Sequence, residues 1–187
     1  MFKVTSGAIA EPVSIPEVKI HLKIDEEETI EDDLLSLMIT AAREYCEKYT
    51  GRSLASKTVE YGIDSFPEQI RLPYGPVASV QSIKYKNSDG NETTMTVNTD
   101  YLVDTDSGRI IPPNGKTWPN FSPYPYTPIK IAYTVGNVAP EGCKQAMLLL
   151  IGHWYANRET VLVGSLSKEL EFSARALLDQ YRVRWWD

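Results

Sequence analysis

Hydrophobic residues are most concentrated near the C-terminal end of the chain, in residues 140–159. Six consecutive apolar residues, 146–151, are followed closely by Trp154 and Tyr155. Six in a row cover every side of a helix, so a helix here is either central in a core or buried in an assembly. Good helix formers continue to residue 156, and Pro140 suits a first turn. The run is shorter than the ~20 apolar residues that span a bilayer, so we expect no membrane segment.

Three further helices are predicted from capping signals and from apolar residues spaced three and four apart. Ser14-Ile15-Pro16-Glu17 fits a capping box and predicts a short helix. The next helix is expected from about Thr29 to Tyr49, with Gly51 as its stop. Its expected apolar positions are Ile30, Leu34, Leu35, Leu37, Met38, Ala41, Ala42, Tyr45, Cys46 and Tyr49. A last helix is expected over 173–182, after an extended excursion from residue 160 to 172. Residues 1–13 show no periodicity and are expected to form a loose arm.

Between about residues 53 and 136, short β-branched and aromatic runs alternate with turn residues. Frequent turns favour an antiparallel sheet or small barrel over βαβ units. The expected strands are 57–64, 70–72, 80–86, 91–97, 101–103, 109–111 and 129–135. The fold class is therefore predicted as α+β, a small helical bundle with an inserted antiparallel β domain. The expected domains are 1–54 (arm and helices), 55–136 (the β insert) and 137–187 (C-terminal helices and tail), with 137–187 packing on 14–50 as one helical domain.

Charge and composition narrow the class of protein. The chain has 19 basic and 25 acidic residues, a net charge of −6, which argues against tight wrapping of nucleic acid. Its two cysteines, Cys46 and Cys143, fall inside predicted helices, as expected of buried thiols in a reduced compartment. The N-terminal residues lack the apolar core of a signal peptide, so the protein is expected in the cytoplasm of the cell that makes it.

The sequence carries no motif for catalysis, a cofactor or a metal. Asn114-Gly115-Lys116-Thr117 lacks the earlier glycine and the following helix of a phosphate-binding loop. Cys46, Cys143, His21 and His153 lie apart, without the paired spacing of a zinc site, and His153 is expected to be a satisfied core residue. The acidic residues 25–33 lack the pattern of a calcium loop. We therefore predict a protein that is not an enzyme and holds no cofactor or metal.

Three features favour assembly with other chains. The excursion 160–172 places Val161, Leu162, Val163 and Leu166 outside any obvious core. The terminal Trp185-Trp186 cannot both point to one side of a helix or strand. The loop 112–128 is rich in proline and aromatic residues. Each could instead pack on its own domain, and exposed aromatic residues near termini often anchor a partner. The pattern indicates a non-enzymatic subunit of an oligomer.

Several stretches, taken in order, carry a more specific signal. They are Val18–Ile24 (VKIHLKI), Ile39–Arg52 (ITAAREYCEKYTGR), Leu72–Tyr85 (LPYGPVASVQSIKY), Tyr101–Asp104, Trp118-Pro119, Ile131–Gly136 (IAYTVG), Lys144–Glu159 (KQAMLLLIGHWYANRE) and Leu177–Val183 (LLDQYRV). Together they resemble the head–tail connector (head completion or adaptor) proteins of tailed double-stranded DNA bacteriophages, in the longer members with a β insert.

The resemblance implies a structural role in the virion, at the head–tail interface, after synthesis in the host bacterial cytoplasm. Such proteins form a ring, commonly twelvefold, under the portal protein. The ring extends the channel for double-stranded DNA, which passes without sequence-specific binding, and offers a surface to a downstream head-closure or tail-joining protein. A wall of carboxylates would let the duplex slide. The residues hypothesised to line the channel are Asp25, Glu26, Glu27, Glu28, Glu31 and Asp32.

A second hypothesis concerns the C-terminal part of the chain, which we expect to contact the portal or a neighbouring subunit. Its residues are Val161, Leu162, Val163, Leu166, Arg182, Arg184, Trp185 and Trp186. The alternative function is a DNA-binding or DNA-processing accessory module that uses Lys84, Lys86 and Arg109 on the sheet. The acidic total and the scattered basic residues weigh against this alternative.

Overall fold

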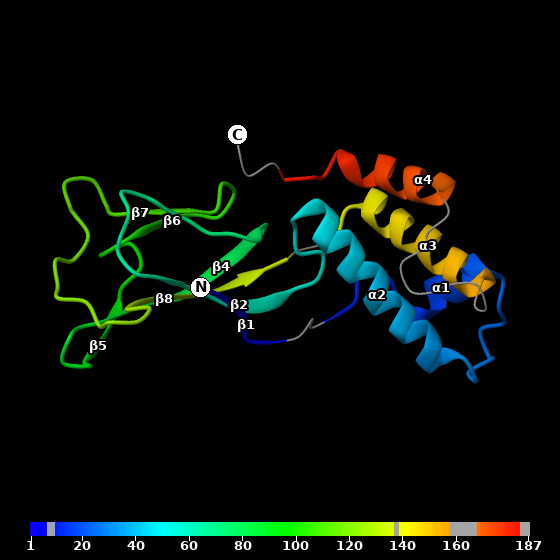
Figure 1. The fold of residues 1–187 in the computed structure, drawn as a ribbon, viewed down its shortest axis with the longest axis horizontal. Helices are drawn as coiled ribbons and strands as arrows, with labels where there is room; N and C mark the ends of the chain where they lie inside the picture. Colours follow the sequence, from blue (N-terminus) through cyan, green and yellow to red (C-terminus); the bar gives the residue numbers. More distant parts are fainter. Residues whose placement is uncertain (7–9, 137–138, 158–167, 184–187) are drawn as a thin grey trace. The chain divides into compact units, whose positions relative to one another are not determined.

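The structure is a computed structural model that describes residues 1–6, 10–136, 139–157 and 168–183 (Figure 1). The chain divides into two compact units. The sheet unit comprises residues 1–9 and 56–137, and the helical unit comprises residues 10–55 and 138–187. Each unit therefore contains two separate stretches of the chain.

Four helices form the helical unit: α1 (Ile15–Leu22), α2 (Asp32–Thr50), α3 (Glu141–Ala156) and α4 (Lys168–Asp179). The capping box predicted for α1 is present, because the Ser14 backbone N–H donates to the Glu17 carboxylate at 2.7 Å and Ser14 Oγ accepts from Glu17 N. Gly51 ends α2 with φ +69°, a conformation that glycine adopts without a steric penalty. Local sequence signals thus set the start of one helix and the end of another.

Helix α3 is the centre of the helical unit, and it contacts α1, α2 and α4 (Figure 1). Ala146, Met147, Leu150 and Ile151 are fully buried on it. The remaining fully buried side chains of this core come mostly from the other helices and their connections: Val18, Leu35, Ala42, Cys46, Cys143, Ala174 and Leu178. The apolar run at 146–151 therefore forms the inside of a small bundle, as predicted.

The phase predicted for α2 is wrong in part. Leu37 and Ile30 were expected on the apolar face, but they are 70% and 88% exposed. The helix begins at Asp32 instead of Thr29, which leaves Ile30 in the preceding turn. The side that packs on the core carries Leu35, Ile39 and Ala42, and Ile39 was not among the expected positions. The correct face is the one that α1 and α3 cover.

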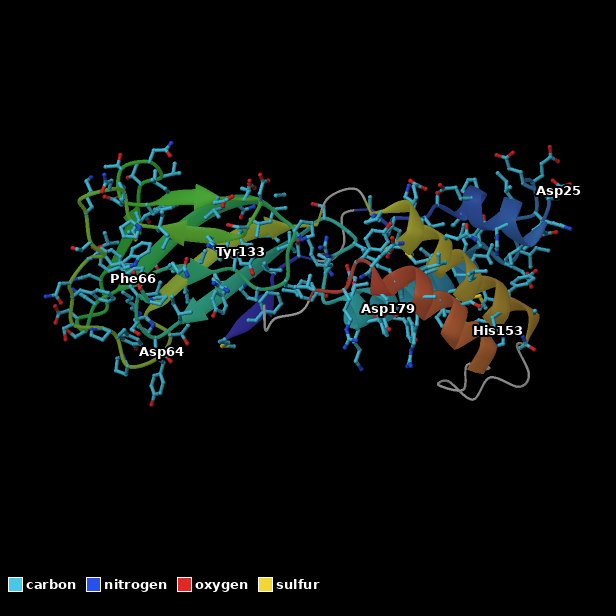
Figure 2. The ribbon with its side chains drawn as sticks, turned by 90° about the horizontal axis from the view of Figure 1, so that it is seen from above. Asp25, Asp64, Phe66, Tyr133, His153 and Asp179 are labelled. Carbon is cyan, nitrogen blue, oxygen red and sulfur yellow. The ribbon has the colours of Figure 1, made fainter. Side chains whose placement is uncertain are left out.

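The sheet unit contains two antiparallel sheets. Its strands are β1 (Phe2–Val4), β2 (Lys57–Ile63), β3 (Ile70–Arg71), β4 (Val77–Lys86), β5 (Glu92–Met95), β6 (Leu102–Asp104), β7 (Arg109–Ile111) and β8 (Ile129–Val135). The larger sheet has the order β1-β2-β8-β4-β5, and the smaller one has the order β3-β7-β6. Their facing residues form a separate core around Tyr133 and the isoleucines at 70, 83, 110, 129 and 131 (Figures 1 and 2).

The α+β class predicted from the sequence is confirmed, and β7 and β8 have the predicted bounds. Two expectations are wrong. The arm over residues 1–13 is not featureless, because Phe2–Val4 pairs with Val59–Tyr61 as the edge strand of the larger sheet. Residues 168–172 are not extended, because α4 begins at Lys168 and ends at Asp179, before the expected residue 182.

Two leucines two positions apart on α2 test the phase of this helix. We expect Leu35→Ala, which removes a fully buried side chain, to lower the free energy of unfolding of the helical unit by about 2–5 kcal/mol. Leu37→Ala should change it by about 0.5 kcal/mol or less, because the side chain is mostly exposed. Urea unfolding followed by far-ultraviolet circular dichroism measures both, and equal losses would contradict the observed phase.

Candidate assembly surfaces

A buried ion pair fixes the end of α2 to the chain that follows it. Arg43 Nη1 lies 3.0 Å from Glu47 Oε2, and Arg43 Nε donates to Glu11 at 2.7 Å. Glu47 Oε1 accepts from the backbone N–H of Leu54 at 2.8 Å and from Ser53 Oγ at 3.3 Å. A buried charge is tolerated only when it is paired and hydrogen-bonded, and this pair meets both conditions. The network therefore holds the chain against the end of α2 just before it leaves the helical unit.

Electrostatics keeps Arg43 charged within this network. Burial alone would favour the neutral guanidine and lower its pKa. The hydrogen bond to Glu11 and the charges of Glu11, Glu47 and Glu44 outweigh burial, so the pKa of Arg43 is raised above its ordinary value. Arg43 consequently keeps its positive charge within the network.

The turn between α1 and α2 contains the acidic residues that were expected to line a channel. Lys19 Nζ forms a buried salt bridge with Asp32 Oδ1 at 2.7 Å and donates to the Glu26 carbonyl at 3.2 Å. Tyr155 Oη donates to Glu31 Oε2 at 2.6 Å, which joins the turn to α3. Glu31 and Asp32 thus have internal structural partners.

The other four members of that set form an exposed segment, residues 25–28, which we call the acidic loop. Asp25, Glu26, Glu27 and Glu28 are all exposed, and Asp25 marks one end of the helical unit in Figure 2. The loop is ordered locally, because Glu27 N donates to Asp25 Oδ1 at 3.1 Å and Ile30 N donates to Glu28 Oε1 at 2.9 Å. The predicted set is therefore divided into two inward-bonded and four outward-facing carboxylates.

Most of the predicted C-terminal interface lies outside the described residues: Val161, Leu162, Val163, Leu166, Arg184, Trp185 and Trp186. Arg182 is described and exposed, with its guanidinium 5.4 Å from the Tyr49 ring centroid. Tyr49 Oη donates to Asp179 at 2.6 Å, and Val183 N donates to the Thr50 carbonyl at 2.8 Å. These bonds fix the end of α4 to the end of α2, so the C-terminal segment starts from a defined position on the helical unit.

The aromatic loop 112–128 packs largely on its own unit. Trp118 stacks on Phe66 with ring centroids 4.8 Å apart, and Phe121 lies 4.7 Å from Tyr85 (Phe66 is marked in Figure 2). Tyr126 differs, because it is 82% exposed. Of the two possibilities left open by the sequence, local packing therefore applies to Trp118 and Phe121.

The basic residues of the alternative DNA-binding hypothesis do not form one group. Lys84 and Lys86 lie on β4 in the larger sheet, and Arg109 lies on β7 in the smaller one, where it pairs in register with Arg71 and Asp104. Lys84 is also paired with Glu92 at 2.9 Å. The three residues therefore lie on two different sheets.

The cysteines and histidines are not brought together either. Cys46 and Cys143 are buried in the helical core, His21 is exposed on α1, and His153 is half-buried with the Asn157 amide 3.3 Å from its Nδ1. Within the described ranges no group of three or more potential metal ligands occurs. No helix in this part of the chain has the length and apolar content to cross a membrane.

Comparison with known proteins identifies the family of this chain. A sequence model of the head completion protein family matches residues 12–164, most of both units. The chain belongs to the head completion protein family. This membership confirms the resemblance to head–tail connector proteins and the predicted class, a structural protein of the virion. No curated protein matches the sequence.

Solved structures share the fold of this head completion protein. A chain in the neck of an empty GTA particle, computed with C6 symmetry, has a TM-score of 0.75 and 23% identity over 98% of this chain and 96% of that one. A chain in the virion of a native gene transfer agent (GTA) particle has a TM-score of 0.75 and 21% identity, with the same shares of the two chains covered. A chain in the neck of the native GTA particle, computed with C12 symmetry, has a TM-score of 0.73 and 22% identity, with 98% of this chain and 96% of that chain covered. At these identities the likeness establishes the fold.

Two glutamates on α2 test the buried ion pair. We expect Glu47→Gln to lower the free energy of unfolding by about 3 kcal/mol, because Arg43 would lose the more deeply buried of its two close carboxylate partners. Glu44→Gln should cost about 0.5 kcal/mol or less, since this exposed carboxylate lies 3.8 Å from Arg43. Denaturant unfolding of the two variants and the wild type measures the difference. Similar losses would show that the network is not structural.

Burial also predicts the reactivity of the thiols. Desolvation raises the pKa of Cys46 to about 12 and that of Cys143 to about 11, so neither forms the reactive thiolate at neutral pH. Alkylation by iodoacetamide at pH 8 should therefore occur only at the rate of unfolding and should become rapid in urea. Fast modification of the folded protein would contradict the burial of both thiols.

Proposed function

We propose that this head completion protein forms a ring at the junction between head and tail, under the portal. The ring would extend the channel for double-stranded DNA and present a surface to the next tail-joining or head-closure protein. The observation that carries the proposal is the family match over residues 12–164, joined to a fold that recurs over nearly the full length of chains in phage-like particle necks. Those necks were computed with C6 and C12 symmetry, which supports a ring of repeated copies.

The distribution of charge suits a channel that DNA passes through without being held. The helical unit has seventeen acidic and eleven basic residues, whereas the sheet unit has eight of each. The whole net charge of −6 therefore belongs to the helical unit. Strong binding of a duplex needs lysines and arginines that neutralise phosphates, and the helical unit has the opposite balance. We infer that the helical unit does not hold a duplex that passes it.

The C-terminal segment is our candidate for docking onto the portal. Arg182 and Val183 are fixed beside Tyr49 and Thr50 at the end of α2, and the sequence continues with Arg184, Trp185 and Trp186. Two adjacent indoles next to arginines have the composition of an interface anchor. The segment 161–166, with its four apolar residues, is a second candidate for contact with the portal or a neighbouring copy.

The proposal is tested by the mass of the purified protein at several concentrations, measured by light scattering, with negative-stain images of the same fractions. A closed ring supports it directly. If the protein is a monomer, its binding to portal-bearing, tail-less heads becomes the deciding measurement, because such a ring can need a template. A protein that neither forms rings nor binds these heads would contradict the proposed function.

Removal of the two terminal indoles gives a more specific prediction. We expect Trp185→Ala with Trp186→Ala to weaken binding to portal-bearing heads by at least about tenfold while the melting temperature stays nearly unchanged. Leu37→Ala, which removes an exposed apolar side chain from α2, is the matched control and should bind as the wild type does. Undiminished binding of the double variant would show that the tail is not the anchor.

A further inference from the structure

The outer face of the larger sheet carries a row of charged residues that the sequence does not reveal. Lys3 on β1 lies opposite Glu60 on β2, and Lys130 on β8 lies opposite Lys84 on β4. Residues on β8 alternate between buried and partly exposed or exposed, with Lys130 on the outward side. With Lys86, two positions further along β4, these side chains form what we call the lysine face: Lys3, Lys84, Lys86 and Lys130.

Two neighbouring hollows shape this face. One, of about 190 Å³, is lined by Lys84, Lys86 and Glu92, and the other, of about 330 Å³, by Lys3 and Glu60. Both are also lined by Tyr126, Thr127 and Lys130. The surface is therefore concave on each side of an exposed tyrosine, where side chains of a partner can enter.

A glycine on β2 leaves room for the segment that lies between the two hollows. A Cβ on Gly62 of β2 would lie 2.1 Å from Thr127 Cγ2, so any larger residue at this position would force the threonine side chain to move. That segment is bonded to β4, since Lys86 N donates to the Pro128 carbonyl at 2.8 Å and Tyr124 N donates to the Lys86 carbonyl at 3.1 Å. The position of the exposed Tyr126 beside the lysines follows from these contacts.

The charge on the face is mixed but predominantly positive. Lys84 pairs with Glu92 at 2.9 Å, Lys130 lies 3.6 Å from Glu60, and Lys86 Nζ lies 4.1 Å from the Tyr124 ring centroid. Four lysines thus share the surface with two glutamates. A uniform polyanion such as DNA would meet both carboxylates, whereas a protein segment with acids and a flanking base would complement every charge.

The helical unit contains a segment of this kind. The acidic loop presents four consecutive exposed carboxylates, Asp25 to Glu28, and the exposed Lys23 precedes it at the end of α1. Copies arranged in a ring touch through two different surfaces, one on each neighbour, so an acidic surface on one unit and a basic one on the other suit such a contact. The acidic loop and the lysine face are one such pair of surfaces.

We propose that the lysine face of one copy binds the acidic loop of the neighbouring copy. The contact rests on the proposed ring and names the surfaces that join its subunits. The lysines would pair with Asp25 to Glu28, and Lys23 would lie against Glu60 or Glu92. This role takes the four exposed carboxylates of the predicted channel-lining set away from the channel wall and places them between subunits.

The experiment reverses the charges separately and then together. One variant carries Lys84→Glu and Lys130→Glu, the second carries Glu26→Lys and Glu27→Lys, and the third carries all four changes. Assembly is followed by light scattering, or on portal-bearing heads if the wild type assembles only there. Each of the first two variants should need at least about tenfold more protein to assemble, because like charges would meet at every contact. The loss should shrink as added salt screens the charges.

Recovery of assembly in two further experiments would identify the partner as a second copy. The third variant, with all four changes, should assemble again, because its acidic sheet face would meet basic loops. An equimolar mixture of the first two variants should also assemble, because alternating copies would place opposite charges at every contact. Arg71→Glu with Arg109→Glu on the smaller sheet makes the same charge change away from the face and is the control for the first variant.

Several results would overturn the contact. Assembly unaffected by either reversal would remove it and leave the proposed ring intact. If assembly recovers in the variant with all four changes but not in the mixture, the lysine face binds the acidic loop of its own copy. A salt-sensitive gel shift with duplex DNA, lost on reversal of the lysines alone with assembly unchanged, would assign the face to DNA. Failure of the wild type to form rings or bind heads would instead reject the proposed function, and this contact with it.

Discussion

The buried pair of Arg43 and Glu47 stabilises the place at which the chain leaves the helical core for the sheet unit. The chain leaves the helical unit immediately after Ala55 and returns to it after residue 137. At the exit, Glu47 accepts hydrogen bonds from Leu54 N at 2.8 Å and from Ser53 Oγ at 3.3 Å, and the carboxylate satisfies a buried backbone N–H at Leu54. An unpaired buried donor costs about 1–3 kcal/mol, so a carboxylate at this point stabilises the place where the helical core ends. Its own burial is tolerated because Arg43 compensates its charge.

The sequence predicts the class of the fold well because its local signals are strong. The capping box at Ser14, the left-handed Gly51 and the apolar run on α3 are each decided within a few residues, and each is present. The phase of α2 could not be predicted in the same way. Leucine, methionine and isoleucine residues at 34, 35, 37, 38 and 39 leave two possible faces, and only the packing of α1 and α3 selects one of them.

The candidate surfaces were predictable in composition but not in geometry. The acidic cluster is evident in the sequence, yet its division follows from contacts with distant residues, such as that of Tyr155 with Glu31 across 124 positions. Lys3 and Lys130 join Lys84 only through strand register, which no local pattern specifies. The pair of Arg43 and Glu47 did have a signal, since opposite charges four residues apart lie on one side of a helix. The sequence could not indicate that this particular pair is buried.

The position of α3 and α4 after the last strand determines the order in which the two units can be completed during synthesis. Phe2–Val4 belongs to the sheet unit but pairs with β2, which is made more than fifty residues later, after α1 and α2. The apolar faces of α1 and α2 are covered still later, because α3 and α4, which cover them, follow the last strand. Since domains form as their parts emerge, the sheet unit closes first. The nascent chain therefore exposes the lysine face before the helical unit is complete.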